Sequence, residues 1–285
     1  MKADDEVFDR NADRIVREIG IPPCPAMLTK LLRETRSEEP DFRRVGRFIG
    51  GDVALASAVL KVANSPFYGL RNKAASVQQA LTLLGLTTVT QLVTGLLLRQ
   101  AFAGAAGAGM ERYWKTSMAT SLIAAMVCRE SGKGDSGVAC TYGLFRDCGM
   151  PVMLQKFPIY ADIFDASALT PGEPALEIEN ERYATNHARV GAILARSWYL
   201  PEFLCYAILH HHDLLYPDEM LAEAEAGSLA LIATGLAAEQ VYSQATGAPC
   251  HEWPVAGEWA LAELGLSAEK LNAIGERVKA SIYHL

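Results

Sequence analysis

The chain has 285 residues, of which 50% are hydrophobic and 21% are charged, and its formal net charge is −7 at pH 7. This composition is typical of a globular protein with a sizeable core, and the negative charge argues against a nucleic-acid partner, because binding to a phosphate backbone requires a basic face. The acidic first ten residues lack the apolar segment of a signal peptide, and no apolar run reaches the about 18–20 residues that span a bilayer. We therefore expect a cytoplasmic protein that binds neither nucleic acid nor membrane.

Two groups of residues are interpreted as structural. Arginines are frequent over residues 33–47, but acidic residues lie among them, which favours a solvated surface of mixed charge. None of the six cysteines belongs to a C-x-x-C pair, so a zinc ribbon and a thioredoxin-type motif are both excluded. Such scattered cysteines are typical of small buried side chains in a reducing compartment.

The N-terminal third predicts consecutive helices. Residues 52–65 have apolar residues on one helical face, with Asp52 as the N-cap and an end near Ser65 because a proline follows. The next helix begins at Ser76, where Ser76 and Gln79 fit a capping box, and stops at Gly85. A further helix follows, with a second box at Thr88.

Small residues dominate "AGAAGAG" at 103–109, which reads as a hinge between two helical lobes. The segments after it repeat like helices, and no convincing strand pattern occurs. The predicted fold is all-α, a helical bundle of two lobes. We expect the N-terminal lobe to comprise residues 1–105 and the C-terminal lobe to comprise residues 106–285.

Four of the six histidines lie between residues 187 and 212, and three of them are consecutive in "LHHHDLLYP". One interpretation is a metal site; the other is a helix C-terminus, where histidine interacts favourably with the helix dipole. Adjacent residues on a helix point about 100° apart, so His211 and His212 are not expected to chelate one ion together. They would serve two neighbouring ions, or one would orient the other.

The stretch "TYGLFRDCGMP" at 141–151 resembles the G-L-L-H-D-I-G signature of the HD superfamily of metal-dependent phosphohydrolases. Asp147 and the flanking glycines are in place, but Arg146 stands where the histidine belongs. "YWKTSMATSLIAA" resembles the W-x-H-S helix of the superfamily, with Thr116 in place of its histidine. "NHARVGAILARSWYLP" and "AILHHHD" resemble its later segments and keep His187, His211 and His212.

The N-terminal lobe resembles that of the HDOD subfamily, the HD-related output domain of bacterial signalling proteins. The stretches that carry this resemblance are "IPPCPAMLTKLL", "GDVALASAVLKVANSPFYG" and "SVQQALTLLGLTTVTQL", and the likeness covers residues from about 20 to about 240. Within it, "ANSPFYG" is either a ligand-recognition loop or a structural turn, and we favour the turn. The resemblance implies an HD-like C-terminal lobe.

The resemblance implies that only part of the family's set of metal ligands is retained in this chain. The retained ligands are Asp147, His187, His211 and His212, which form either a vestige or a site for a single divalent ion such as iron, manganese or zinc. The final carboxylate of the family aligns with Ala238, although Glu239 is adjacent. No cofactor is expected otherwise.

Arginine cannot ligate a metal, because it stays protonated and only donates hydrogen bonds. One hypothesis is that the Arg146 guanidinium replaces a missing ion and pairs with nearby carboxylates, with Asp213 as a candidate. The alternative is that Arg146 extends into solvent.

Three functions remain open. The resemblance and the missing ligands favour a non-catalytic regulatory or scaffold protein of bacterial signal transduction that binds signalling proteins or a small ligand. The first alternative is a metal-dependent phosphohydrolase or phosphodiesterase that acts on a nucleotide, and the second is a receptor that binds a nucleotide without cleaving it.

Overall fold

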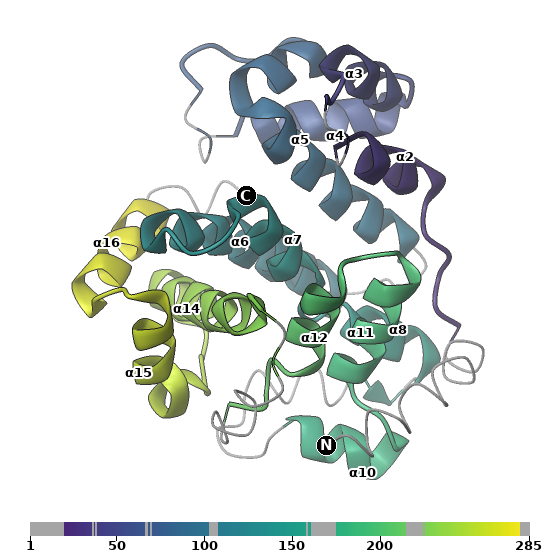
Figure 1. Ribbon diagram of the computed structural model, residues 1–285. Coiled ribbons are helices and arrows are strands. Elements are labelled where there is room, and N and C mark those ends of the chain that lie inside the picture. Colours follow the sequence, from purple (N-terminus) through teal and green to yellow (C-terminus); the bar gives the residue numbers. More distant parts are fainter. Residues whose placement is uncertain are drawn as a thin grey trace.

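In a computed structural model of the chain, the structure describes residues 20–35, 37, 39–65, 68, 70–102, 108–157, 159–160, 175–214, 224 and 226–279. Within these ranges every long regular element is an α-helix and no strand occurs, so the predicted all-α class is confirmed. Figure 1 shows the first four helices at one end of the molecule and the remaining helices below them.

The first four described helices are α2 (Ala26–Thr35), α3 (Phe42–Gly50), α4 (Val53–Ala63) and α5 (Val77–Ala101). The predicted caps are confirmed: the Asp52 side chain accepts a hydrogen bond from the backbone N–H of Leu55, and the Ser76 side chain accepts one from Gln79. Helix geometry breaks at Gly85, whose φ of 84° is available to glycine at little steric cost, and resumes at once. Thr88 therefore lies inside α5, and the second box predicted there is wrong.

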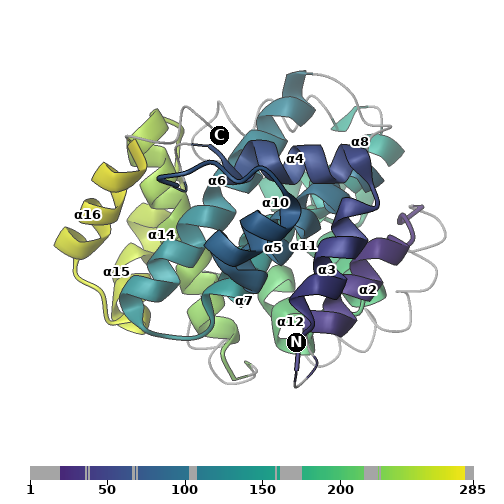
Figure 2. The ribbon, with the colours of Figure 1, turned by 90° about the horizontal axis from the view of Figure 1, so that it is seen from above.

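The rest of the described chain forms helices α6 (Ala108–Ser131), α7 (Ser136–Phe145), α8 (Gly149–Lys156), α10 (Ala175–Tyr183), α11 (His187–Ser197), α12 (Glu202–Leu209), α14 (Ser228–Thr246), α15 (Trp253–Leu264) and α16 (Ala268–Lys279). α6 packs against α7 and α14, while α11 packs against α8 and α12. α15 packs mainly on α14, and α16 contacts α14 and α6 (Figures 1 and 2).

α5 joins the two ends of the molecule. It contacts α2, α3 and α4 on one side and α7 on the other (Figure 2), and one hydrophobic core runs through all of them. Among the described helices, α5 alone is long and apolar enough to cross a membrane, contrary to the expectation that no run would qualify. Most of that stretch is buried inside the protein, as in a core helix.

The "ANSPFYG" stretch has structural contacts in its described part. The Asn64 side chain donates to the Ala74 carbonyl oxygen at 2.8 Å and accepts from the Ala74 N–H at 2.7 Å, so it closes the loop between α4 and α5. Tyr68 packs beside Leu122 and Cys140 of the helices below. These contacts support the structural interpretation. Pro66, Phe67 and Gly69 of this stretch, and residues 103–107 of the predicted hinge at 103–109, lie outside the described residues, so the boundary at 105 stays a prediction.

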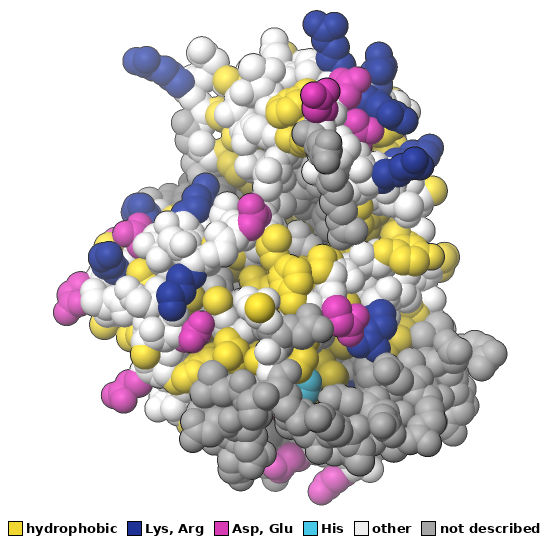
Figure 3. Space-filling view, in the orientation of Figure 1, with side chains coloured by type: hydrophobic (Ala, Val, Ile, Leu, Met, Phe, Trp, Pro, Cys, Tyr) yellow, Lys and Arg dark blue, Asp and Glu magenta, His cyan; other side chains and the backbone are white. Residues whose placement is uncertain are grey.

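The surface over α2 and α3 carries both signs of charge. Figure 3 shows Lys and Arg side chains interspersed with Asp and Glu at this end, and one pair, Arg44 with Glu34, is 3.4 Å apart. This agrees with the predicted mixed-charge surface. The six cysteines are free thiols, four of them buried.

Candidate metal centre

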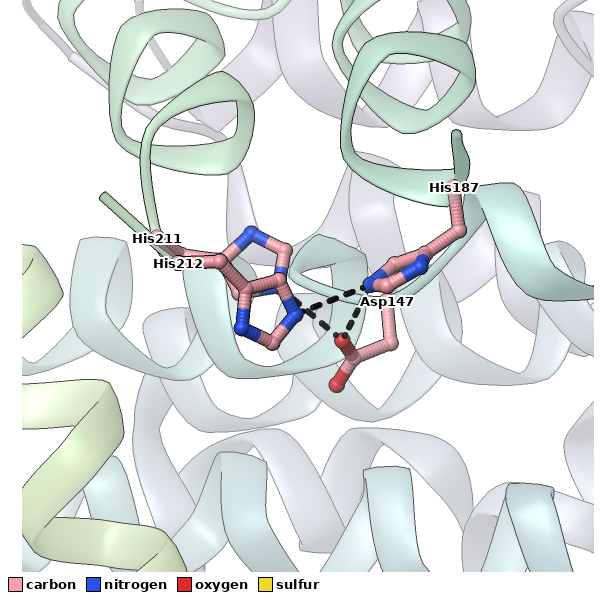
Figure 4. A group of neighbouring side chains, drawn as sticks. All are labelled: Asp147, His187, His211 and His212. Carbon is pink, nitrogen blue, oxygen red and sulfur yellow. Dashed lines mark hydrogen bonds and ion pairs between the residues drawn. The ribbon is translucent and has the colours of Figure 1, made fainter. Parts of the chain in front are cut away.

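The four predicted ligands meet at one point. One ligand atom from each of Asp147, His187, His211 and His212 lies within 4.8 Å of the others (Figure 4). Asp147 lies in the turn between α7 and α8, His187 is the first residue of α11, and His211 and His212 follow the end of α12. Residues from three separate chain segments therefore converge, as a metal site requires.

The two adjacent histidines both reach this point, which the sequence argument did not expect. That argument assumed a continuous helix, but α12 ends at Leu209 with His210 as its C-cap, so His211 and His212 belong to a turn. Their ring centroids are 4.0 Å apart, and both rings face His187 (Figure 4). The helix-terminus interpretation applies to His210 alone, whose Nδ1 contacts Asp213 at 2.7 Å.

Close packing of α8 on α11 brings Asp147 near His187. A Cβ at Gly149 would lie 2.0 Å from the backbone oxygen of His187, so only glycine fits at this helix crossing. Gly191 lies opposite, and the Cys148 thiol donates to its carbonyl oxygen at 3.6 Å. The glycines of the two family-like motifs thus have a geometric role: they set the separation of two candidate ligands.

The hydrogen bonds at Nδ1 fix the tautomer of each histidine. His211 Nδ1 is 2.7 Å from the Ile208 carbonyl oxygen, which can only accept, so this nitrogen carries the proton. His187 Nδ1 donates to Glu179 at 2.9 Å, and His212 Nδ1 donates to Glu252. Each ring therefore presents its Nε2 lone pair to the centre, as metal-binding histidines with outer acceptors do.

Three of the separations between the four candidate ligand atoms are close to those around a single ion, and all four atoms lie within 4.8 Å of one another. His187 Nε2 is 3.0 Å from His212 Nε2 and 3.6 Å from Asp147 Oδ1, and His211 Nε2 is 3.2 Å from the same oxygen. A tetrahedral ion with bonds of about 2.0–2.1 Å separates its ligands by about 3.3 Å. The Nε2 atoms of His187 and His212 face each other, and this contact is satisfied either by a cation between them or by a proton on one of the two nitrogens. These residues fit one divalent ion.

Two glutamates, one buried and one partly exposed, hold the histidines from behind. Glu179 is almost fully buried and accepts three hydrogen bonds, from the Tyr160 hydroxyl and from both the backbone N–H and Nδ1 of His187. Burial raises the pKa of Glu179, but His187 and the hydrogen-bond donors lower it by a larger amount, so the net shift of the pKa is downward. Glu252 behaves alike: burial raises its pKa, yet His212 and Arg146 bring it down to about 2. Both glutamates are ionised at neutral pH.

The pKa values of the two adjacent imidazoles, His211 and His212, shift in opposite directions. Burial, together with the neighbouring His212 and Arg146, lowers the pKa of His211 from 6.5 to about 3. For His212, burial lowers the pKa, but Glu252 raises it more, so the net shift is upward. Burial raises the pKa of Asp147 because it disfavours the charged carboxylate. Arg146 and His211 lower it by more, so the pKa lies well below the usual range and Asp147 is ionised.

Arg146 is buried beside this centre, with 5% of its side chain exposed, and does not extend into solvent. One guanidinium nitrogen contacts Glu239 and lies 3.7 Å from Asp147, while the other lies 3.4 Å from Glu252. Burial lowers the pKa of Arg146, but the three carboxylates raise it well above its ordinary value. The predicted pairing with carboxylates is correct. The candidate Asp213 is wrong, because its carboxylate contacts His210 instead.

The two other departures from the family pattern are also explained. Thr116 shares a hydrogen bond of 3.2 Å with the hydroxyl of Tyr242, so a neutral pair stands where the first histidine of the pattern belongs. Ala238 is buried, and the adjacent Glu239 directs its carboxylate to Arg146.

Glu179 and Glu252 are functional residues that sequence reasoning missed. Glu179 precedes His187 by eight residues, in the helix before it, and only the helical pattern there would have hinted at an inward position. Glu252 is 40 residues from His212, and no local spacing connects them.

The chain matches the HDOD domain family over residues 21–214, more than half of its length. It belongs to that family. The predicted resemblance is therefore confirmed, while Glu239 and Glu252 lie beyond the matched region. Curated relatives include an uncharacterized protein of Treponema pallidum (strain Nichols), 24% identical over 219 residues, which are 73% of this chain and 40% of that protein. The uncharacterized YuxH of Bacillus subtilis is 36% identical over 64 residues, 22% of this chain and 16% of YuxH. This HDOD chain thus spans less than half the length of the curated relatives it matches.

Solved structures share the fold. An HDOD domain protein of Geobacter sulfurreducens superposes with a TM-score of 0.72 at 21% identity, covering 98% of this chain and 95% of that one. A Marinobacter aquaeolei VT8 protein, provisionally named a signal transduction protein, superposes with a TM-score of 0.73 at 20% identity. The match covers 99% of this chain and 64% of that one. A Shewanella amazonensis SB2B protein, provisionally named a phosphohydrolase, superposes with a TM-score of 0.70 at 20% identity. The match covers 96% of this chain and 97% of that one. At these identities the likeness is one of fold.

Proposed function

We propose that the protein is a regulatory member of the HDOD family that hydrolyses no phosphoester and holds one divalent ion as a structural element. The observation that carries this proposal is the buried guanidinium of Arg146 at the position of the HD histidine. A permanent cation there neutralises the carboxylates that a second ion would need. One ion remains possible, at Asp147 and the three histidines.

The ligand set supports a structural role for that ion. Four protein ligands complete a tetrahedral zinc site, whereas catalytic zinc sites keep a position open for water. When bound, the ion would supply positive charge and fixed geometry. Arg146 lies within 4 Å of the carboxylates of Asp147, Glu239 and Glu252, and a fourth carboxylate, Glu179, contacts His187. When all four are ionised, these described carboxylates exceed the one guanidinium by three negative charges. A divalent ion reduces this excess, so binding is electrostatically favourable.

Regulation through a signalling protein is the role that the family name implies, and we propose it for this chain. A cytoplasmic location and protein partners belong to the same proposal. The provisional signal-transduction name of the Marinobacter aquaeolei protein is consistent with it.

One observation favours the alternative of a phosphohydrolase. Asp147 and His212 are 28% and 22% exposed, so a substrate could approach the ion from their side. Removal of one ligand by such a substrate would open the position that catalysis needs.

Elemental analysis combined with a phosphodiester assay tests the proposal. Protein purified without chelator or affinity tag is compared with a His211→Ala/His212→Ala variant, and both are incubated with bis(p-nitrophenyl) phosphate and with cyclic dinucleotides. We expect about one equivalent of zinc, iron or manganese in the wild type, a loss of that ion in the variant, and equal, negligible turnover. Two equivalents of metal, or turnover confined to the wild type, would contradict the proposal. A cyclic dinucleotide that raises the melting temperature without being cleaved would favour the receptor.

A further inference from the structure

The helices beyond the family match complete the centre. Glu239 of α14 and Glu252 at the start of α15 both lie after residue 214, where the match ends. Glu252 contacts the outer nitrogen of His212 with one oxygen and lies 3.4 Å from Arg146 with the other. A single carboxylate thus links the candidate ion site to the C-terminal helices.

Glu252 also controls how α15 begins. It stands at the N-cap of α15, and its backbone oxygen accepts from the N–H groups of Val255 at 3.1 Å and Ala256 at 2.9 Å. Its side chain accepts none of the N–H groups of the first turn, because the carboxylate faces His212 and Arg146. The Glu252 side chain therefore gives the first turn of α15 no cap, and Glu252 holds this turn through its backbone oxygen, whose position is fixed from the centre.

α15 packs mainly on one other helix, and Lys133 also contacts the Glu263 carbonyl oxygen near its end. Its main neighbour is α14, with Ala256 and Ala260 on the buried face, and Val255 on the opposite face is 62% exposed. The connection from α14 passes through Gly247, which is in the left-handed region at φ 78°. A helix attached along one face, with a linker at one end, responds to the loss of its anchor by local opening.

We infer that Glu252 is a positioning residue for His212 and that it makes α15 the part of the protein that responds to the ion. This inference rests on the proposed single-ion centre. A bound ion fixes the Nε2 side of His212, so His212 Nδ1 remains directed at Glu252 and the first turn of α15 is held. Without the ion, His212 is joined to His187 only by the 3.0 Å contact between their Nε2 atoms, which is a hydrogen bond only when one of the two nitrogens carries a proton, so the ring and its hold on Glu252 are less firmly fixed.

Hydrogen exchange of backbone amides tests this on the full-length protein, loaded with zinc or treated with a chelator, with the metal content measured in each sample. In the wild type we expect ion removal to accelerate exchange over residues 247–264 by about tenfold, while α16, which packs on α14 and α6, stays unchanged as an internal reference. In Glu252→Ala the same residues should exchange rapidly with or without zinc. The zinc dissociation constant should rise by about 10–100-fold.

Three further variants distinguish the role of the Glu252 side chain from a general effect of mutating α15 or of disturbing Arg146. Glu252→Gln keeps an acceptor for His212 Nδ1 and should restore part of the ion response, while Glu258→Ala, an exposed position on the same helix, should behave as the wild type. Glu239→Gln removes a partner of Arg146 without contacting His212, so its ion response should persist.

Two results would overturn the inference: unchanged exchange over 247–264 when the wild type loses its ion, or a full ion response in Glu252→Ala. Both differ from a failure of the proposed function, which would appear as phosphodiester turnover or as a second equivalent of metal. A wild type that binds no ion would overturn the inference and the single-ion centre together.

Discussion

Gly149→Ala tests whether the packing of two helices sets the geometry of the metal centre. A Cβ at this position would lie 2.0 Å from the His187 backbone oxygen and 2.8 Å from the Gly191 nitrogen. Both neighbours are backbone atoms, so no side chain can move aside, and α8 must shift by about 1.4 Å to bring the first distance to the 3.4 Å of an ordinary contact. Its φ is not in the left-handed region, so the strain is steric alone.

The shift has two measurable consequences. Overpacking of this kind destabilises by about 1–3 kcal/mol, and about 2–4 °C is lost per kcal/mol in a protein of this size, so the metal-free protein should melt about 2–12 °C lower. Asp147 precedes Gly149 by two residues and would move with α8, away from its present 3.6 Å from His187 Nε2. Because metal sites tolerate distance errors of only about 0.2 Å, we expect the bound ion to be largely lost.

Calorimetry with and without zinc, followed by elemental analysis, measures both effects. Gly50→Ala is the matched control, because Gly50 ends α3 and a Cβ there meets nothing within 4 Å, so its melting temperature should be unchanged or slightly raised. A Gly149→Ala protein with the wild-type melting temperature and the wild-type ion content would refute the reasoning.

Three further predictions concern buried polar groups. Arg146→Met leaves Glu239 and Glu252 without this cation. Since both carboxylates are partly exposed, we expect the free energy of unfolding, measured in urea, to fall by about 1–3 kcal/mol. An unchanged unfolding midpoint would contradict the ion-pair network. Because burial lowers the pKa of His211 from 6.5 to about 3, the unfolded chain binds a proton there at higher pH than the folded one. The free energy of unfolding of the metal-free protein should therefore fall as the pH drops through about 6.5 toward about 3, and a His211→Gln variant should show a flatter profile over this window. Asn64→Ala removes two hydrogen bonds to Ala74 and should lower the free energy of unfolding by about 1–3 kcal/mol, whereas a value near zero would return that loop to consideration as a ligand site.

Local signals were enough to predict the N-terminal helices. Asp52 and Ser76 cap the helices that they were expected to cap, because an N-cap depends on groups within three residues of it. Gly85 was read as the end of a helix, and the break is real. The chain resumes as a helix at once, because the next residues pack into the core that α5 shares with α7. That outcome depends on partners distant in the sequence.

The ligands of the centre were predictable, but their arrangement was not. Spaced motifs named Asp147, His187, His211 and His212, and the structure brings all four together. Whether two adjacent histidines converge depends on where α12 stops, and no signal in "AILHHHD" places that end before His210 rather than after it.

Long-range electrostatics were beyond the sequence. Asp213 was one candidate partner for Arg146, yet it contacts His210, three residues away. The actual partners, Glu239 and Glu252, are 93 and 106 residues from Arg146 and have no spacing in common with it. A buried cation takes the carboxylates that the fold brings to it, so only the packing of α14 and α15 identifies them.

The exchange of histidine for arginine at position 146 changes what the centre can do. A neutral imidazole can bind a metal, so it would leave Glu239, Glu252 and Asp147 available to a second ion. A guanidinium stays protonated, neutralises the same carboxylates without any ion, and keeps them in place at all physiological pH values. In the proposed function the guanidinium thus takes the place of a second ion. In the proposed function only the ion at the histidines is variable, and its presence would determine the order of α15.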